Sequence, residues 1–166
     1  MPQTVLIVED EPLALASISF FLRDHGYRIV QATDGSEALK LLESKLKIDM
    51  VLSDIALPGI DGYQVLQRVR YRLPGTPVIL MSGNFTLGCP PVRHGGADAY
   101  VSKPLDLEEL LREIDVALGK RSVDEYTPLT DVKGSTVFRP SFQPPQTNQL
   151  APWLESSVGI GSPGFG

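Results

Sequence analysis

The sequence has few of the residues that would indicate disulfide bonds, a zinc site or a membrane anchor. Its 166 residues include one cysteine, Cys89, which excludes an internal disulfide framework. The two histidines, His25 and His94, lie far apart, which argues against a zinc site. No apolar run approaches the roughly 18 residues of a membrane span, and the first residues lack the basic region of a signal peptide. We therefore expect a cytoplasmic protein that does not cross a membrane.

Positive charge is also scarce. The chain has 15 Lys and Arg against 20 Asp and Glu, which gives a formal net charge of -5. Residues 1–118 carry 11 basic and 16 acidic residues, whereas residues 119–166 carry 4 of each. This acidic balance argues against nucleic acid as the direct partner.

Five short apolar segments have the length of β-strands, namely residues 4–8, 28–32, 50–53, 77–81 and 99–101. Most of them do not alternate apolar and polar residues, which is typical of parallel strands covered on both faces. Helical patterns lie between them. This alternation over about 118 residues predicts an α/β fold, a doubly wound five-stranded parallel sheet in a three-layer α/β/α arrangement.

Apolar residues three or four positions apart mark the expected helices. The first three stripes are Leu13, Ala16, Phe20 and Phe21; Leu39, Leu42 and Leu46; and Leu66, Val69 and Leu73. In the last helix Asp106 can cap the start, with Glu109 three residues later, and Gly119 can end it. Its stripe is Leu107, Leu110, Leu111, Ile114 and Leu118.

Two segments depart from this alternation. The stretch "GNFTLGCPPVRHGGAD", residues 83–98, contains paired prolines and several glycines where a fourth helix would be expected, so we expect that helix to be short, displaced or missing. Residues 119–166 contain six Pro, six Gly and six Ser without any period. We expect a domain at residues 1–119 and a largely disordered tail at 120–166. The tail is either an inert linker or a partner-binding segment, in which Trp153 and Leu154 could anchor the partner.

Polar residues follow the expected strands where the carboxyl ends of an open α/β sheet form a crevice. They are Glu9, Asp10 and Glu11; Asp54; Ser82, Gly83 and Asn84; and Ser102 and Lys103. If the first and third strands are neighbours, Glu9, Asp10 and Asp54 share one pocket. Their mutual repulsion would be relieved by a hard divalent cation, and an all-oxygen ligand set fits Mg²⁺.

Asp54 with a lysine and a hydroxyl group nearby is typical of a phosphoryl-transfer site in which the aspartate is the nucleophile. Each residue alone also has a structural interpretation. Asp10 or Glu11 could cap a helix that starts at Pro12, Tyr100 could be an ordinary core residue, and Lys103 could be a solvated loop lysine. The cysteine in "LGCPP" has no nearby His and acid pair, and we interpret it as a small loop side chain.

Four motifs occur in order and in register, "VEDEP", "LSDIALPGIDG", "LMSG" and "ADAYVSKP". With them, residues 1 to about 119 resemble the receiver domain of bacterial two-component response regulators. The resemblance implies a flavodoxin-like fold with strand order 2-1-3-4-5. It also implies that Asp54 accepts a phosphoryl group, and that Mg²⁺ is held by Glu9, Asp10, Asp54 and the backbone carbonyl of Ala56.

The same resemblance gives roles to the remaining site residues. Ser82 would bind the phosphoryl oxygens, Tyr100 would follow it inward as a switch, and Lys103 would bind the phosphate. The bond between Lys103 and Pro104 would be cis, and Gly83 would keep the pocket mouth open. Side chains two positions after the acceptor and after the switch hydroxyl, here Ala56 and Asn84, tune the phosphate lifetime, which the sequence does not predict.

The resemblance also implies partners. A histidine kinase or a phosphotransfer protein would donate the phosphate, and a downstream protein target would read it. Nothing after Gly119 could form a DNA-binding domain, so we expect a stand-alone receiver with no direct DNA binding. Receivers commonly dimerise through their fourth helix, fifth strand and fifth helix. The fourth helix is interrupted in this sequence at residues 83–98, which leaves dimerisation open.

Two alternatives remain beside a phosphorylation-controlled switch, whose only catalysis would be its own phosphorylation and dephosphorylation. One is a phosphorylation-independent scaffold that works through its tail. The other is a Mg²⁺-dependent phosphohydrolase of the haloacid-dehalogenase type. That family places a D-x-D nucleophile after its first strand, where this chain has "VEDEP".

Overall fold

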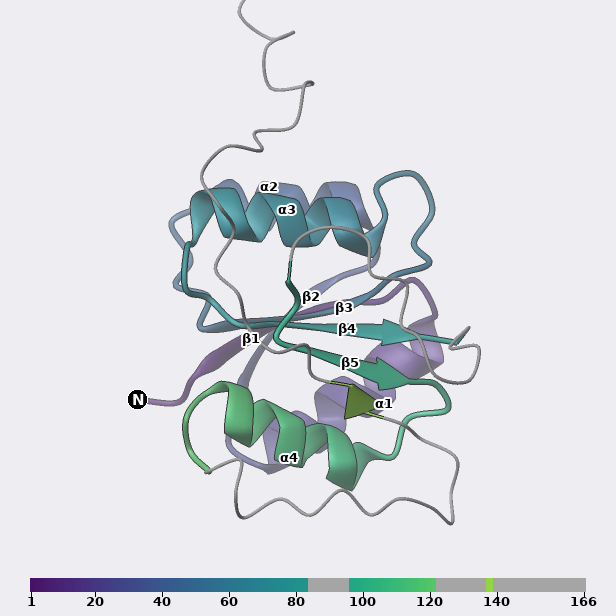
Figure 1. The fold of residues 1–166 in the computed structure, drawn as a ribbon, viewed down its shortest axis with the longest axis vertical. Coiled ribbons are helices and arrows are strands. Elements are labelled where there is room, and N and C mark those ends of the chain that lie inside the picture. The colour runs from purple at the N-terminus through teal and green to yellow at the C-terminus, as the bar shows by residue number, and fades with distance from the viewer. Residues whose placement is uncertain (84–95, 122–136, 139–166) are drawn as a thin grey trace, which may run out of the picture.

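The computed structural model describes residues 1–83, 96–121 and 137–138, which form six strands and four helices (Figure 1). In chain order these are β1 (Thr4–Val8), α1 (Pro12–Asp24), β2 (Arg28–Ala32), α2 (Gly35–Glu43), β3 (Met50–Asp54), α3 (Gly62–Arg72), β4 (Val78–Ser82), β5 (Ala99–Ser102), α4 (Leu107–Ala117) and β6 (Val137–Phe138). The five predicted strands are all present, with ends that differ from the prediction by at most one residue.

The strands form one sheet in the order β2-β1-β3-β4-β5-β6. The first five are parallel, which confirms the predicted order 2-1-3-4-5. The sixth is antiparallel to β5 and was not predicted. Its two residues lie in the segment that we expect to be largely disordered, where no strand was predicted. Composition alone does not show pairing with a sheet edge, because such pairing uses backbone groups that every non-proline residue has.

Helices cover both faces of the sheet, with α2 and α3 on one side and α1 and α4 on the other (Figure 1). Alternate residues of β1 enter two separate cores. Leu6 and Val8 pack on the α2 and α3 side, whereas Val5 and Ile7 pack on the α1 and α4 side. Both faces of the strand are therefore buried, which is why the strand sequences show no polar alternation.

The predicted apolar face of α1 is wrong for Leu13, Ala16 and Phe20, whereas Phe21 does pack against the core. Leu13 and Phe20 are 76% and 75% exposed, and the buried apolar residues are Leu15, Ile18 and Leu22. Both sets have helical spacing, so periodicity could not choose between them.

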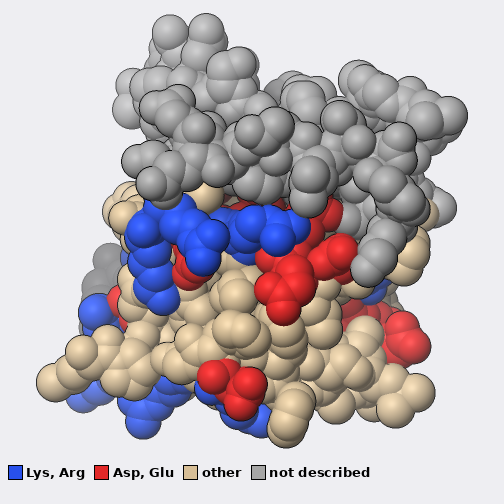
Figure 2. All heavy atoms as spheres, turned by 90° about the horizontal axis from the view of Figure 1, so that it is seen from below, with Lys and Arg blue, Asp and Glu red and all other residues tan. Residues whose placement is uncertain are grey.

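Figure 2 shows the side of the molecule that carries α1 and α4. Charged side chains of both signs gather in a band across this face, and much of the remaining described surface carries no charge.

The predicted helix ends are mostly confirmed. Asp106 accepts hydrogen bonds from the backbone N–H groups of Glu108 and Glu109, and Gly119 follows α4 with a positive φ of 71°. Helix α2, in contrast, already ends at Glu43, so Leu46 lies beyond it and is exposed.

Several predictions concern residues outside the described part of the chain. These are the form of the fourth helix at 84–95, the positions of Asn84, Cys89 and His94, and the tail apart from residues 120–121 and 137–138. None of the helices that the structure describes is long and apolar enough to span a membrane.

Candidate functional site

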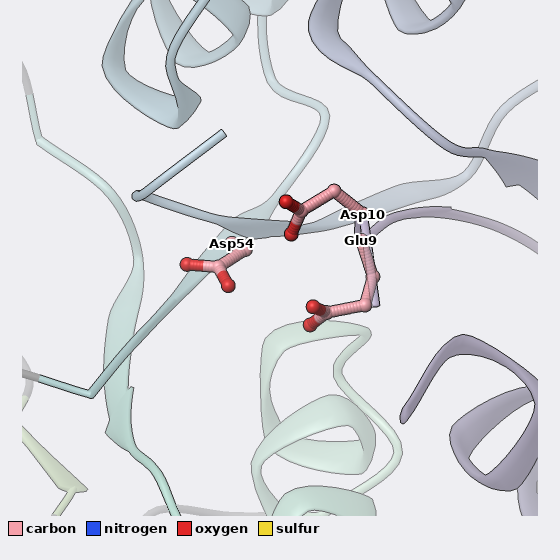
Figure 3. Close-up of side chains that lie close together, drawn as sticks. All are labelled: Glu9, Asp10 and Asp54. Carbon is pink, nitrogen blue, oxygen red and sulfur yellow. The ribbon is translucent and has the colours of Figure 1, made fainter. Parts of the chain in front are cut away.

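The carboxyl ends of β1 and β3 bring the three predicted carboxylates together. The two strands are neighbours, with Val8 opposite Ser53, so Glu9 and Asp54 both emerge at the same edge of the sheet. Glu9 is 1% exposed and Asp54 is 5% exposed, whereas Asp10 is open to solvent. One carboxylate oxygen from each of the three lies within 4.8 Å of the others (Figure 3).

Lys103 brings a positive charge to this cluster from β5, two strands away from β3. Its Nζ donates one hydrogen bond to Asp54 Oδ2 and a second, 2.8 Å long, to Glu9 Oε2. The backbone N–H of Lys103 donates to the carbonyl of Ser82 at 2.7 Å, and the Lys103–Pro104 bond is cis, as predicted. Hydrogen bonds therefore hold both the Nζ and the backbone of Lys103 in place.

The electrostatics of the pocket follow from this arrangement. Burial raises the pKa of Glu9, although the hydrogen bond from Lys103 acts in the opposite direction. Burial would lower the pKa of Lys103, but hydrogen bonds to Asp54 and Glu9 outweigh it and the net shift is upward. Lys103 is thus held as an ammonium ion between two buried carboxyl groups.

The second oxygen of Asp54 has a backbone partner. Asp54 Oδ1 accepts a hydrogen bond of 2.9 Å from the N–H of Ala56. With Lys103 on Oδ2, both carboxylate oxygens have a donor and the side chain has a fixed orientation. Ala56 lies beside the acid cluster at the exposed start of the loop after β3.

Ser82 lies on β4 and Tyr100 on β5, the two strands that follow β3 in the sheet. Ser82 is the last residue of β4, is 8% exposed and pairs in register with Ser102 of β5. Tyr100 is buried in the core on the α2 and α3 side, and burial raises the pKa of its phenol. Its ring therefore already lies inside the protein in this structure. A Cβ added at Gly83 would meet nothing within 4 Å, so the end of β4 is open there.

The sequence also allowed Asp10, Glu11 and Lys103 to have purely structural roles, as helix caps or as a solvated lysine. Glu11 is the N-cap residue of α1, but no side chain caps this helix, so neither Asp10 nor Glu11 serves as a cap. Asp61 does cap α3, in a reciprocal capping box with Gln64. The side chain of Lys103 is 24% exposed and donates two hydrogen bonds, unlike a solvated loop lysine.

One relationship was missed from the sequence, namely the direct bond between Lys103 and Glu9. The two residues are 94 positions apart, and no spacing or motif links them. The sequence signal was only that both follow strand ends. The structure adds that Glu9 and Asp54 share one lysine.

The donor set at this pocket fits a magnesium ion. Three carboxylates within 4.8 Å supply the hard oxygen ligands that Mg²⁺ prefers, and the exposure of Asp10 leaves room for ligands from solvent. Among the described residues, this is the one group of three or more His, Cys, Asp or Glu side chains with metal-binding geometry.

Comparisons with known proteins agree with the geometry. The family model of the response regulator receiver domain matches residues 5–115. The probable transcriptional regulatory protein TcrX of Mycobacterium tuberculosis is 34% identical over 123 residues, which is 74% of this chain and 52% of TcrX. The chain thus spans about half the length of that relative.

Two solved structures show the same fold. The signal receiver domain of an HD domain-containing protein from Pseudomonas fluorescens Pf-5 is 30% identical, with a TM-score of 0.65 over 72% of this chain and 97% of that one. The receiver domain of sensor histidine kinase PA1611 from Pseudomonas aeruginosa PAO1 is also 30% identical, with a TM-score of 0.63 over 72% and 99%. That structure is described with a magnesium ion coordinated in its active site cleft.

Proposed function

Because the chain belongs to the response regulator receiver domain family, we propose that Asp54 accepts a phosphoryl group and that its phosphorylation switches a protein-binding surface. The observation that carries the proposal is the position of Asp54, which is buried, oriented by two hydrogen bonds and grouped with two further carboxylates and one lysine. A histidine kinase or a phosphotransfer protein would supply the phosphoryl group as a phosphohistidine.

The transfer is a substitution at phosphorus. An oxygen of Asp54 attacks the phosphorus atom, the bond between phosphorus and the donor's imidazole nitrogen breaks, and the imidazole leaves with the electron pair. The product is an acyl phosphate on Asp54. Attack of water on it restores the carboxylate and releases inorganic phosphate. A magnesium ion bound by Glu9, Asp10, Asp54 and the Ala56 carbonyl would neutralise charge on the transferring group.

Lys103 has a second role in this scheme. In the unphosphorylated protein it bonds to both Asp54 and Glu9. When Asp54 carries a phosphoryl group, Lys103 can bond to a phosphoryl oxygen while Glu9 still holds it in place. The Ala56 N–H meanwhile fixes Asp54 Oδ1, which sets the direction from which the other oxygen attacks.

Ser82 and Tyr100 would pass the change to the surface. Ser82 ends the strand between those that precede Asp54 and Lys103 in the sheet order, so its hydroxyl can bond to a phosphoryl oxygen. Tyr100 lies on β5, three residues before Lys103. Phosphorylation then shifts a pre-existing equilibrium between two forms. In this proposal residues 1–119 are the switch, 120–166 are a tail, and the output is contact with another protein.

The proposal is tested by incubating the protein with acetyl phosphate and Mg²⁺ and measuring its intact mass. The wild type should gain one phosphate and Asp54→Asn should gain none. Asp49→Asn is the matched control, because Asp49 lies just before the other end of the same strand, and it should be labelled like the wild type. Equal labelling of Asp54→Asn would refute the assignment.

A further inference from the structure

The sheet of this protein ends in a strand that comes from far along the chain. Val137 and Phe138 form β6, which pairs antiparallel with β5, Val101 opposite Val137 and Tyr100 opposite Phe138. Of the strands that the structure describes, β6 is the one antiparallel member. Without it, β5 would be the edge strand and would present unpaired N–H and C=O groups along one side.

The covered strand is linked to the phosphorylation site through Lys103, which follows β5. The two β5 residues in the pairing, Tyr100 and Val101, precede Lys103 by three and two positions, and Lys103 bonds to Asp54 and Glu9. Tyr100 is the proposed switch residue. A change at Asp54 that moves Lys103 therefore acts on the backbone that β6 contacts.

The number of residues after α4 is sufficient for the chain to reach this edge. The residues after α4 are fixed, since the N–H groups of Lys120 and Arg121 donate to the carbonyl of Asp115, and Lys120 Nζ donates to the hydroxyl of Tyr27 at 2.8 Å. Residues 122–136 then separate Arg121 from Val137. Fully extended, they could span about 50 Å, against about 16 Å for the length of α4.

The pairing is short, and its attachment to the domain compensates for this. Two residue pairs form few backbone hydrogen bonds, so β6 would not bind tightly as a free peptide. Because β6 belongs to the same chain as β5, the pairing is intramolecular and does not depend on the protein concentration. A weak intramolecular contact is suited to release, because a modest change at β5 is enough to shift the equilibrium between paired and released β6.

We propose that the edge of β5 is a docking site for the chain's own segment around Val137 and Phe138, and that phosphorylation of Asp54 releases this segment. The bound segment blocks strand addition by other proteins at β5, and its release exposes the edge to the downstream target or to a second copy. The docking stands on the observed pairing alone, whereas its release by phosphate rests on the proposed function of Asp54. Binding is reciprocal, so loss of the segment also favours phosphorylation.

The test measures hydrogen–deuterium exchange of the peptide containing residues 99–103 in the full-length protein. Val137→Pro/Phe138→Pro should speed exchange of its edge-facing amides severalfold, since proline lacks the N–H and disfavours strand pairing. Asn148→Pro/Gln149→Pro carries the same substitutions further along the chain and should exchange like the wild type. Equal exchange in the two double variants would overturn the docking site.

The coupling is measured in the same experiment. Acetyl phosphate with Mg²⁺ should speed exchange in the wild type to the level of Val137→Pro/Phe138→Pro, and that variant should take up phosphate faster than the wild type. Phosphorylation that leaves exchange unchanged would overturn the release but not the docking. Protection that falls on dilution would show that a second copy supplies the strand. Failure of Asp54 to accept phosphate would refute the proposed function and leave the proline comparison valid.

Discussion

Gly62, the first residue of α3, packs directly against the backbone of Asp54. A Cβ added at Gly62 would lie 2.2 Å from the carbonyl oxygen of Asp54 and 2.8 Å from the Cα of Ile55. The N–H of Gly62 also donates to the carbonyl of Ile55 at 3.1 Å. The loop after β3 thus returns to the strand end from which Asp54 projects, and the absence of a side chain at Gly62 permits this.

Gly62→Ala should therefore destabilise the protein and impair phosphorylation. The added methyl group must push the α3 start away from Asp54, at a cost of about 1–3 kcal/mol in the free energy of unfolding. Urea denaturation measures the first effect, and labelling by acetyl phosphate the second. At Gly83 a Cβ meets nothing within 4 Å, so Gly83→Ala should stay within about 0.5 kcal/mol of the wild type. Equal stability of the two variants would contradict the close packing.

Magnesium should stabilise the folded protein. The three carboxylates lie close together only in the native state, so an ion that they bind stabilises that state. Adding millimolar Mg²⁺ should therefore raise the melting temperature by a few degrees. Asp10→Asn should reduce this rise, because Asp10 is one of the three carboxylates. Asp24→Asn removes the same charge at the opposite, exposed end of α1 and should keep the full rise. Thermal denaturation with and without Mg²⁺ gives the comparison, and an equal rise in both variants would place the ion elsewhere.

Arg70 of α3 should contribute to stability out of proportion to its place near the surface. It donates to the carbonyls of Thr76 and Gly96 and to the carboxylate of Asp98, at 2.6 to 2.8 Å. It thus ties α3 to the start of β4 and to the residues before β5. Arg70→Met should lower the free energy of unfolding by about 1–2 kcal/mol.

Arg72 is the matched control for that change, because it lies on the same helix and is exposed. Arg72→Met should change the free energy of unfolding by less than about 0.5 kcal/mol. Chemical denaturation of both variants decides between a tertiary clamp and an ordinary surface arginine, which would give equal effects.

Asp49 should give the protein part of its acid sensitivity. The hydrogen bond from the Thr4 N–H, followed by that from Lys47, lowers the pKa of Asp49. A carboxyl group with a lowered pKa stabilises the fold above its unfolded-state pKa of about 3.9, and this contribution is lost as the pH falls through the lower, folded-state pKa. Asp49→Asn should therefore be less stable than the wild type at neutral pH, and the difference should shrink in acid.

Denaturation with urea at neutral pH and in acid measures this convergence. Lys47→Met should keep most of the pH dependence, because the backbone bond from Thr4 is the larger cause. A stability difference that stays constant with pH would show that Asp49 contributes through packing or shape instead.

The sequence predicted the parts of this protein that depend on local pattern. Apolar runs between turn residues located five strands, and Asp106 and Gly119 marked the ends of the last helix because capping depends on near neighbours in the chain. The four motifs also named the residues at the strand ends. Parallel strands place those ends at one edge, so Glu9, Asp10 and Asp54 had to lie close together once the order was known.

What the sequence could not decide involved a choice among contacts distant in the chain. Two sets of residues on α1 had helical spacing, and packing against the sheet buried Leu15, Ile18 and Leu22 and left Leu13 and Phe20 in solvent. The bond between Lys103 and Glu9 joins residues with no shared pattern.

The strand β6 shows the same division most plainly. By itself the sequence determined five parallel strands and the polar residues at their ends, because periodicity is a property of neighbouring residues. The strand order that brings Glu9, Asp10 and Asp54 together came from the resemblance to receiver domains. Only the tertiary structure decided that Val137 and Phe138 lie beside Tyr100 and Val101. Backbone pairing at an open edge needs donors and acceptors that nearly every residue has, so it depends on where the chain is brought and not on which side chains it carries.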